Sequence, residues 1–178
     1  IKNDQFARSG LRPEVLSLAL DAWDKAWQRG DTERFEYTII DYSMHSSQKR
    51  FWTIDMETGR LLIHTVVAAG RGSDQDGDGW VNKMGNTNGA GTSSVGLMRT
   101  AETYRGKHGK SLRLDGLERG FNDRVRERAV VIHGSDYVNE SGNGGSAGCS
   151  LGCPALDRDV TGEVIETIKG GSLVFAYY

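Results

Sequence analysis

Apolar residues recur at helical spacing near the N-terminus of the chain. Between Pro13 and Arg29 they fall three and four residues apart, as on the buried face of an amphipathic helix. Proline suits the first turn of a helix, and Gly30 suits its end. The pattern predicts an N-terminal helical segment over residues 1–34 that packs on a core formed by residues 35–178.

After Gly30 the helical period gives way to short runs rich in β-branched and aromatic residues. Three such runs cover residues 35–42, 50–55 and 61–69, and a turn at Glu57-Thr58-Gly59 predicts an antiparallel meander. Further strands are predicted at residues 111–114, 129–133 and 172–178, with a helix at about 159–169. The chain is therefore predicted to be mainly β with a few helices.

Residues 70–96 are dominated by Gly, Asp, Asn and Ser, which predicts a long surface loop of the kind that forms lids or binding loops. Within it, Asp74, Asp76 and Asp78 stand at alternate positions and Gly79 is the sixth residue, as at the start of a calcium loop. Position twelve is Gly85 rather than a glutamate. A calcium site and a plain solvated acidic loop both fit this pattern.

Composition excludes several classes of protein. A length of 178 residues suits one domain, and a net charge of -2 gives no field for binding nucleic acid. No apolar run approaches the roughly 20 residues of a membrane-spanning helix. Two cysteines are too few for a disulfide scaffold or a four-cysteine zinc site.

A histidine and two cysteines carry the strongest chemical signal. His133 ends an apolar run, and Cys149 and Cys153 follow it by sixteen and twenty residues. At the end of a strand, a histidine can serve as a general base, and a thiol beside it can serve as a nucleophile. The turn from Ser150 through Gly152 offers backbone N–H groups to a developing oxyanion. The alternative is a buried thiol and a histidine that only packs.

His133-Gly134 and the later Ser150-Leu151-Gly152-Cys153 resemble the signature of the YkuD-type L,D-transpeptidases, in particular a murein L,D-transpeptidase branch. The resemblance runs over residues 35–178, through blocks at 37–43, 70–73, 93–96, 103–109, 111–118, 120–123, 133–138 and 152–156. It implies a YkuD-like β-sandwich or partly closed barrel, with residues 35–178 as the catalytic domain. It also implies peptidoglycan stem peptides as substrates, no required cofactor, and export to the periplasm or cell envelope.

The resemblance distinguishes between the two cysteines. The spacing common in the wider family selects Cys149, whereas the flanking Pro-Ala-Leu of the branch selects Cys153, which we prefer as the nucleophile. Cys149 then becomes a candidate redox partner that pairs with Cys153 when oxidised. Two family arginines are replaced here, by Ala155 and by Cys149, and Ala69 stands where the branch has histidine.

Four further residues are candidates for substrate binding. Tyr104, His108 and Gly134 belong to the shared blocks, and Arg113 is a candidate to replace the missing cation, as is Arg71. We expect a cysteine acyl-enzyme that forms 3-3 cross-links or exchanges the terminal D-amino acid of stem tetrapeptides. Two alternatives remain: an L,D-carboxypeptidase with the same site, and an inactive wall-binding or calcium-stabilised module.

Overall fold

The computed structural model describes residues 4–139 and 147–178. Its helices are α1 (Asp4–Arg8), α2 (Pro13–Arg29) and α3 (Arg158–Ile168). Its strands are β1 (Glu36–Asp41), β2 (Phe51–Asp55), β3 (Leu61–Thr65), β4 (Ala69–Gly70), β5 (Gly96–Gly106), β6 (Gly109–Gly116), β7 (Val131–Ser135), β8 (Cys149–Ser150), β9 (Ala155–Asp157) and β10 (Leu173–Tyr177). The predicted mainly β fold with few helices is confirmed.

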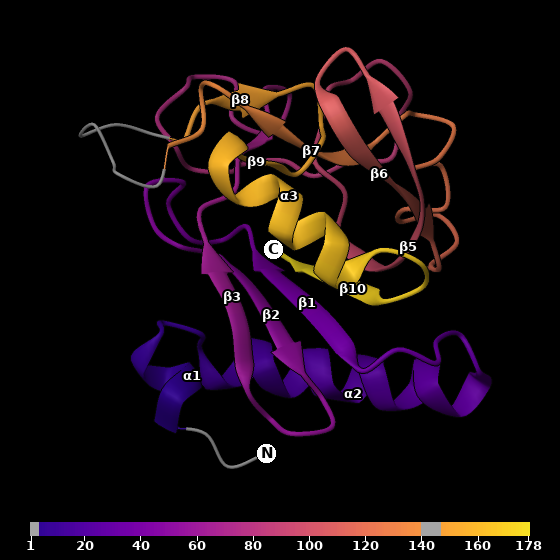
Figure 1. The fold of residues 1–178 in the computed structure, drawn as a ribbon. Coiled ribbons are helices and arrows are strands. Elements are labelled where there is room, and N and C mark those ends of the chain that lie inside the picture. The colour runs from indigo at the N-terminus through magenta and orange to yellow at the C-terminus, as the bar shows by residue number, and fades with distance from the viewer. Residues whose placement is uncertain (1–3, 140–146) are drawn as a thin grey trace.

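Eight strands form one sheet in the order β3-β2-β1-β10-β5-β6-β7-β9, and β4 and β8 form a separate parallel pair. The pairs β1–β10 and β7–β9 are parallel, and the other neighbours in the large sheet are antiparallel. The predicted meander of β1, β2 and β3 is confirmed. The sheet curves around α3, while α2 lies across its other side beneath β1–β3 (Figure 1).

Side chains on β1 show how the sheet separates two cores. Tyr37 and Ile39 pack with the apolar face of α2, and the Tyr37 hydroxyl donates a 2.6 Å hydrogen bond to the carbonyl of Ala19. Ile40 points to the opposite face, where Val164 and its neighbours on α3 fill the curve of the sheet. Within the described residues, no helix is both long and apolar enough to cross a membrane.

The structure differs from the sequence-based expectation in two places. The long strand β5 was not predicted, because charged and polar residues fill its outer half and a bulge between Thr100 and Thr103 breaks its alternation. The predicted surface excursion at residues 70–96 is also wrong in part. Ser73 and Ser93 are fully buried, with Ser93 Oγ accepting from Gly70 N and Ser73 Oγ accepting from Ser93 N. These hydroxyls replace the backbone pairing of a regular sheet, so this polar segment packs in the interior of the protein.

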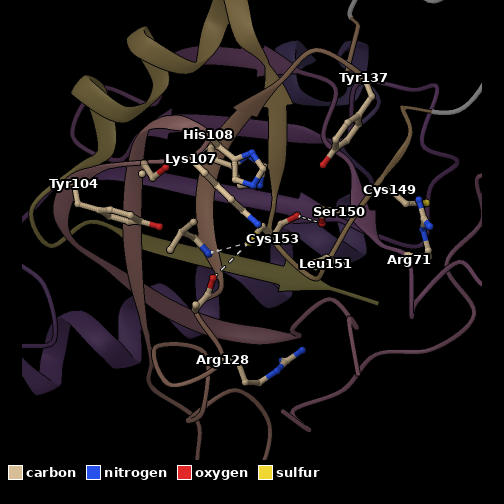
Figure 2. Close-up of a pocket in the computed structure, with 15 residues that line it drawn as sticks. Arg71, Tyr104, Lys107, His108, Arg128, Tyr137, Cys149, Ser150, Leu151 and Cys153 are labelled. Carbon is tan, nitrogen blue, oxygen red and sulfur yellow. Dashed lines mark hydrogen bonds between the residues drawn. The ribbon is translucent and has the colours of Figure 1, made fainter. Parts of the chain in front are cut away.

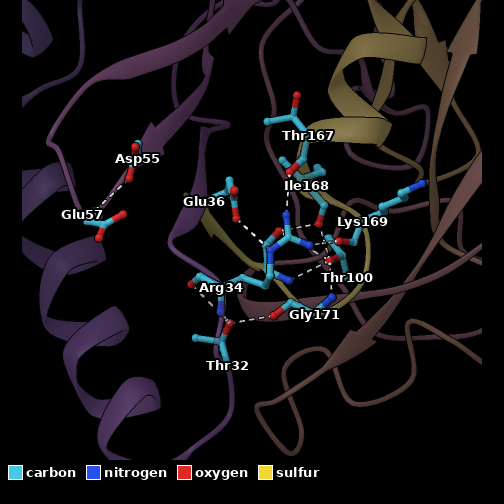
Figure 3. A network of polar contacts seen from close by, with 11 residues as sticks. Thr32, Arg34, Glu36, Asp55, Glu57, Thr100, Thr167, Ile168, Lys169 and Gly171 are labelled. Atoms are coloured by element: carbon cyan, nitrogen blue, oxygen red, sulfur yellow. Dashed lines mark hydrogen bonds and ion pairs between the residues drawn. The ribbon is translucent and has the colours of Figure 1, made fainter.

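A polar network holds the C-terminal end of α3 to the sheet (Figure 3). Arg34 donates to the carbonyls of Lys169 at 2.7 Å and Thr167 at 3.1 Å. The hydroxyl of Thr100 donates to Ile168 O at 2.6 Å and accepts from Ser172 N at 2.9 Å. Carbonyls in the last turn of a helix have no partner within the helix, so these side chains supply the missing donors.

We expect Thr100→Val to destabilise the protein by about 1–3 kcal/mol, because it leaves the backbone N–H groups of Gly171 and Ser172 without their acceptor while preserving side-chain volume. Urea unfolding measures the effect as a lower midpoint with an unchanged slope. Thr103→Val, on the same strand but partly exposed, is the matched control. Equal stability of the two variants would contradict this account of the network.

Candidate active site

A pocket of about 730 Å³ opens where the β5–β6 hairpin, the start of β7 and the turn between β8 and β9 meet. Figure 2 shows the side chains that surround it. The described lining residues are Arg71, Tyr104, Gly106, Lys107, His108, Ser111, Arg128, Ala129, Val131, His133, Tyr137, Cys149, Ser150, Leu151 and Cys153. The pocket thus brings together the predicted histidine and both cysteines.

Parallel pairing of β7 with β9 sets the position of Cys153 relative to His133. In this register His133 lies opposite Ala155, and Cys153 precedes the paired segment by two residues, close to Val131 on β7. A hydrogen bond from Val131 N to Cys153 Sγ, at 3.4 Å, is consistent with this placement. His133 and Cys153, which are twenty residues apart in the sequence, therefore line the same pocket.

Ser150 closes the turn that carries Cys153. Its hydroxyl donates to the carbonyl of Cys153 at 2.6 Å and accepts from Gly152 N at 3.1 Å. Gly152 has a φ of 113°, and a Cβ there would lie 2.7 Å from the carbonyl oxygen of Thr92, so glycine is required. Both residues were predicted to serve the oxyanion. In the structure the Gly152 N–H is already bound by Ser150, and the pair shapes the turn.

His133 is buried, with 2% of its surface exposed, and its Nδ1 lies 3.0 Å from the carbonyl of Gly134. A carbonyl only accepts, so Nδ1 carries the proton of this bond and Nε2 is left with a free lone pair. Burial lowers the pKa of His133, and the nearby charges of His108 and Lys107 lower it further, against the raising effect of the Gly134 carbonyl. The imidazole is therefore held neutral near pH 7.

The environment of Cys153 holds its thiol in the protonated form. Burial raises the pKa of Cys153, and the Val131 N–H, Arg128 and Lys107 act in the opposite direction. The sulfur donates to the carbonyl of Ala129 at 3.6 Å. Ala129 itself has a φ of 55°, an uncommon value for a residue other than glycine, which turns this carbonyl at the mouth of β7. The site thus combines a neutral thiol with a neutral imidazole.

Cys149 lines the same pocket but has different neighbours. Its Sγ donates to Oδ2 of Asp74 at 3.8 Å, and both cysteines are free thiols in the structure. Burial raises the pKa of Cys149, and the carboxylate of Asp74 raises it further, against the smaller lowering effects of Arg71 and Arg50. A carboxylate beside a thiol opposes formation of the thiolate, which is the reactive form. Among the side chains around Cys153, by contrast, those that act on its pKa are cations.

The structure separates the predicted substrate contacts into two groups. Tyr104 and His108 line the pocket, and the His108 ring stacks on His133 with centroids 4.2 Å apart. Arg113 does not line it: its guanidinium lies over the Tyr104 ring at 4.2 Å and forms an ion pair with a glutamate. Gly134 also lies outside the lining, because it faces Thr161 on α3.

Several lining residues were missed in the sequence. Lys107 and Arg128 supply cations that act on Cys153, Tyr137 packs against Gly148, and Leu151 projects with 76% of its surface exposed. Lys107 lies within a block that resembles the family, which was a usable signal. Arg128 is one of three arginines within five residues and has no distinguishing pattern. Only the fold shows that its guanidinium turns inward.

The three acidic residues of the proposed calcium loop lie together, with ligand oxygens within 4.8 Å of one another. Asp74 is buried, and its two oxygens accept backbone N–H groups of Asp78 at 3.1 Å and Gly79 at 3.0 Å. Asp76 and Asp78 are exposed. Carboxylate oxygens are suitable calcium ligands, so the residues fit the ion, although Asp74 already closes the loop by hydrogen bonds alone.

Comparison with known proteins identifies the family. A family model described as the L,D-transpeptidase catalytic domain matches residues 7–177, nearly the whole chain. The chain belongs to the L,D-transpeptidase catalytic domain family. This confirms the resemblance found in the motifs. A comparison with curated proteins gives no match.

Solved structures share the fold of this family member at low sequence identity. An L,D-transpeptidase from Mycobacterium tuberculosis aligns with a TM-score of 0.51 at 12% identity, over 81% of this chain and 58% of its own. The protein Bd1075 of Bdellovibrio bacteriovorus aligns with a TM-score of 0.50 at 11% identity, over 81% of this chain and 49% of its own. The present L,D-transpeptidase domain therefore spans about half to three fifths of the length of these structures.

We expect His108→Phe to raise the pKa of His133, because the variant keeps an aromatic ring over the imidazole and removes the like charge that opposes its protonation. Titration of the His133 ring by NMR measures the shift directly. His64→Phe, at a histidine stacked on Trp52 in another part of the sheet, is the control and should leave the titration unchanged. A fall in the His133 pKa in the His108 variant would contradict the assigned charge effect.

If the acidic loop binds calcium, calorimetric titration should show a saturable heat with Ca²⁺, which Asp76→Asn together with Asp78→Asn removes. Asp21→Asn together with Asp24→Asn, at two acidic positions on α2, controls for nonspecific loss of charge. No heat in the micromolar to millimolar range would exclude the calcium site and leave the solvated acidic loop.

Proposed function

We propose that this domain is a peptidoglycan L,D-transpeptidase that acts through a Cys153 acyl-enzyme on stem tetrapeptides. The observation that carries the proposal is the β7–β9 register, which sets Cys153 beside the strand position of His133 at the wall of a 730 Å³ pocket. Membership of the L,D-transpeptidase family supports the substrate class. Because peptidoglycan lies outside the cytoplasmic membrane, the proposal includes export to the periplasm or cell envelope.

In the proposed reaction, the Cys153 thiol turns from the Ala129 carbonyl toward Nε2 of His133. As Sγ attacks the carbonyl of the third residue of the stem, Nε2 takes the thiol proton, and the C–N bond to the terminal D-amino acid breaks. The same proton passes to the departing amine. An amine of a second stem then attacks the thioester and transfers a proton to Nε2. The C–S bond breaks as the new amide forms, and Nε2 returns the proton to Sγ of Cys153.

The neutral resting pair explains why the histidine must act as a general base. Burial keeps Cys153 protonated and His133 unprotonated, so proton transfer accompanies attack rather than preceding it. Lys107 and Arg128 favour the developing negative charge on sulfur. Cys149 has the carboxylate of Asp74 3.8 Å from its sulfur, and this carboxylate acts against ionisation. These electrostatics support Cys153 over Cys149 as nucleophile.

The oxyanion of the tetrahedral intermediate needs donors that are not already used. Gly152 N–H is bound to Ser150 Oγ, whereas no hydrogen bond within the described residues uses the N–H of Cys153. The Ser150 hydroxyl donates to the carbonyl of Cys153. This bond fixes the backbone of Cys153 and so orients its N–H before the substrate arrives. We assign this N–H to the oxyanion and Ser150 to positioning it.

Incubation with tetrapeptide muropeptides, followed by mass analysis, tests the reaction. We expect cross-linked dimers and free D-alanine from the wild type, and loss of both in Cys153→Ala, because that variant has no nucleophile. Cys149→Ser should retain most of the activity. Intact-protein mass should also show an acyl adduct on the wild type and on Cys149→Ser, but none on Cys153→Ala.

The product pattern separates the alternatives. Tripeptides without dimers would identify an L,D-carboxypeptidase, in which water resolves the thioester. No adduct and no product after full reduction would favour an inactive wall-binding module. Activity that survives in Cys153→Ala and disappears in Cys149→Ser would overturn the choice of nucleophile. A gain of activity on reduction that Cys149→Ser abolishes would identify Cys149 as the redox partner.

A further inference from the structure

The pocket is cationic. Its described lining includes the side chains of Arg71, Lys107 and Arg128 and contains no aspartate or glutamate. We propose that Arg71 binds a free carboxylate of the donor stem peptide and so makes the enzyme select donors that carry this charge over amidated ones. The inference rests on the proposed function, and names the residue and the chemical group that set its substrate specificity.

Arg128 is not available for this role. One terminal nitrogen of its guanidinium donates to Gly85 O at 2.9 Å and Ser94 Oγ at 3.1 Å, and the other donates to Thr92 O at 2.7 Å. It is a partly buried structural cation that ties the segment beneath the pocket to β7. Its charge favours an ionised Cys153, but its directed hydrogen bonds are used by the protein itself.

Arg71 has the opposite character. Its side chain is exposed, and no hydrogen bond or ion pair among the described residues holds its guanidinium. Lys107, the other exposed cation, extends toward Cys153 on one side of the pocket, while Arg71 lies on the far side of Leu151 beside Cys149 (Figure 2). Arg71 therefore combines free donors with a place in the lining, which Arg113 lacks.

The backbone beneath Arg71 is fixed relative to the nucleophile. Its own N–H donates to Ser150 O at 2.8 Å, and Ser150 closes the turn that carries Cys153. On either side, Gly70 and Gly72 pack against backbone so closely that added Cβ atoms would lie 2.1 Å from the carbonyl oxygens of Gly91 and Ala90. A residue that recognises the substrate must be held rigidly relative to the reacting sulfur, and the backbone of Arg71 meets this requirement.

A planar guanidinium binds a carboxylate through two parallel hydrogen bonds, which an amide cannot accept in the same way. The proposed donor carries two such groups near the scissile bond: the terminal carboxylate of the fourth residue and the side-chain carboxylate of a third residue such as diaminopimelate. Either source presents the same chemistry to Arg71. Removing its charge should weaken binding in the pocket.

Three tetrapeptide donors test the proposal: one with both carboxylates free, one with the side-chain carboxyl amidated, and one with the terminal carboxyl amidated. With the fully free donor, we expect Arg71→Met to lower kcat/KM by about 10- to 100-fold, as for loss of a charge-assisted hydrogen bond. With the donor that lacks the recognised carboxylate, Arg71→Met and the wild type should have nearly equal kcat/KM. The donor that removes the difference identifies which carboxylate Arg71 binds.

Arg105→Met is the matched control, since Arg105 is an exposed arginine on the hairpin beside Lys107 but outside the pocket lining. It should leave all three rates unchanged, and Arg71→Lys should recover part of the loss. Calorimetry on Cys153→Ala, with and without Arg71→Met, measures donor affinity without turnover and should show the same dependence on amidation. Equal losses on all donors in Arg71→Met would overturn the inference, whereas a wild type that reacts with none would instead refute the proposed function.

Discussion

The parallel pairing of β7 with β9 determines the site. A short strand of three residues, Ala155–Asp157, aligns against the strand of His133 and places the preceding cysteine at Val131. Parallel strands need a connection that leaves the sheet and returns, and here that connection contains β8 and the cysteine turn. The turn that carries Cys153 is thus part of the crossover connection between β7 and β9. Anything that shifts the β9 register by one residue would turn the chain before Ala155 away from His133.

Electrostatics in the pocket follow from burial and from unequal distribution of charge. Burial favours the neutral forms of the His133 imidazole and the Cys153 thiol. The cations of the lining act only weakly on the resting thiol, since burial outweighs them. Their influence grows when negative charge develops on sulfur or arrives with a ligand. At the neighbouring Cys149 the carboxylate of Asp74 opposes ionisation more strongly than Arg71 and Arg50 favour it. One pocket therefore surrounds its two thiols with different charges.

Sequence reasoning was most successful where one local pattern determined the structure. The bounds of α2 match the predicted helix, because the apolar period, Pro13 and Gly30 all act within that segment. It failed where distant partners decide the conformation. Ser93 is buried only because Gly70 and Ser73 approach it, and β5 forms because β6 and β10 flank it. The same limit applied to the site. Motifs pointed to His133 and Cys153, but they could not show that the Gly152 N–H donates to Ser150, because that bond depends on the side-chain conformation of Ser150.

The position of β10 has a consequence for the order of assembly. This strand, Leu173–Tyr177, pairs with β1 on one side and β5 on the other, and so lies in the middle of the eight-stranded sheet. Without it, the strands β1–β3 on one side and β5, β6, β7 and β9 on the other have no hydrogen-bonded strand between them, and each set has an open edge. A chain delivered from its N-terminus, by a ribosome or across a membrane, would present the strand that joins them after every other strand. The active enzyme would thus be completed only after the rest of the domain had emerged.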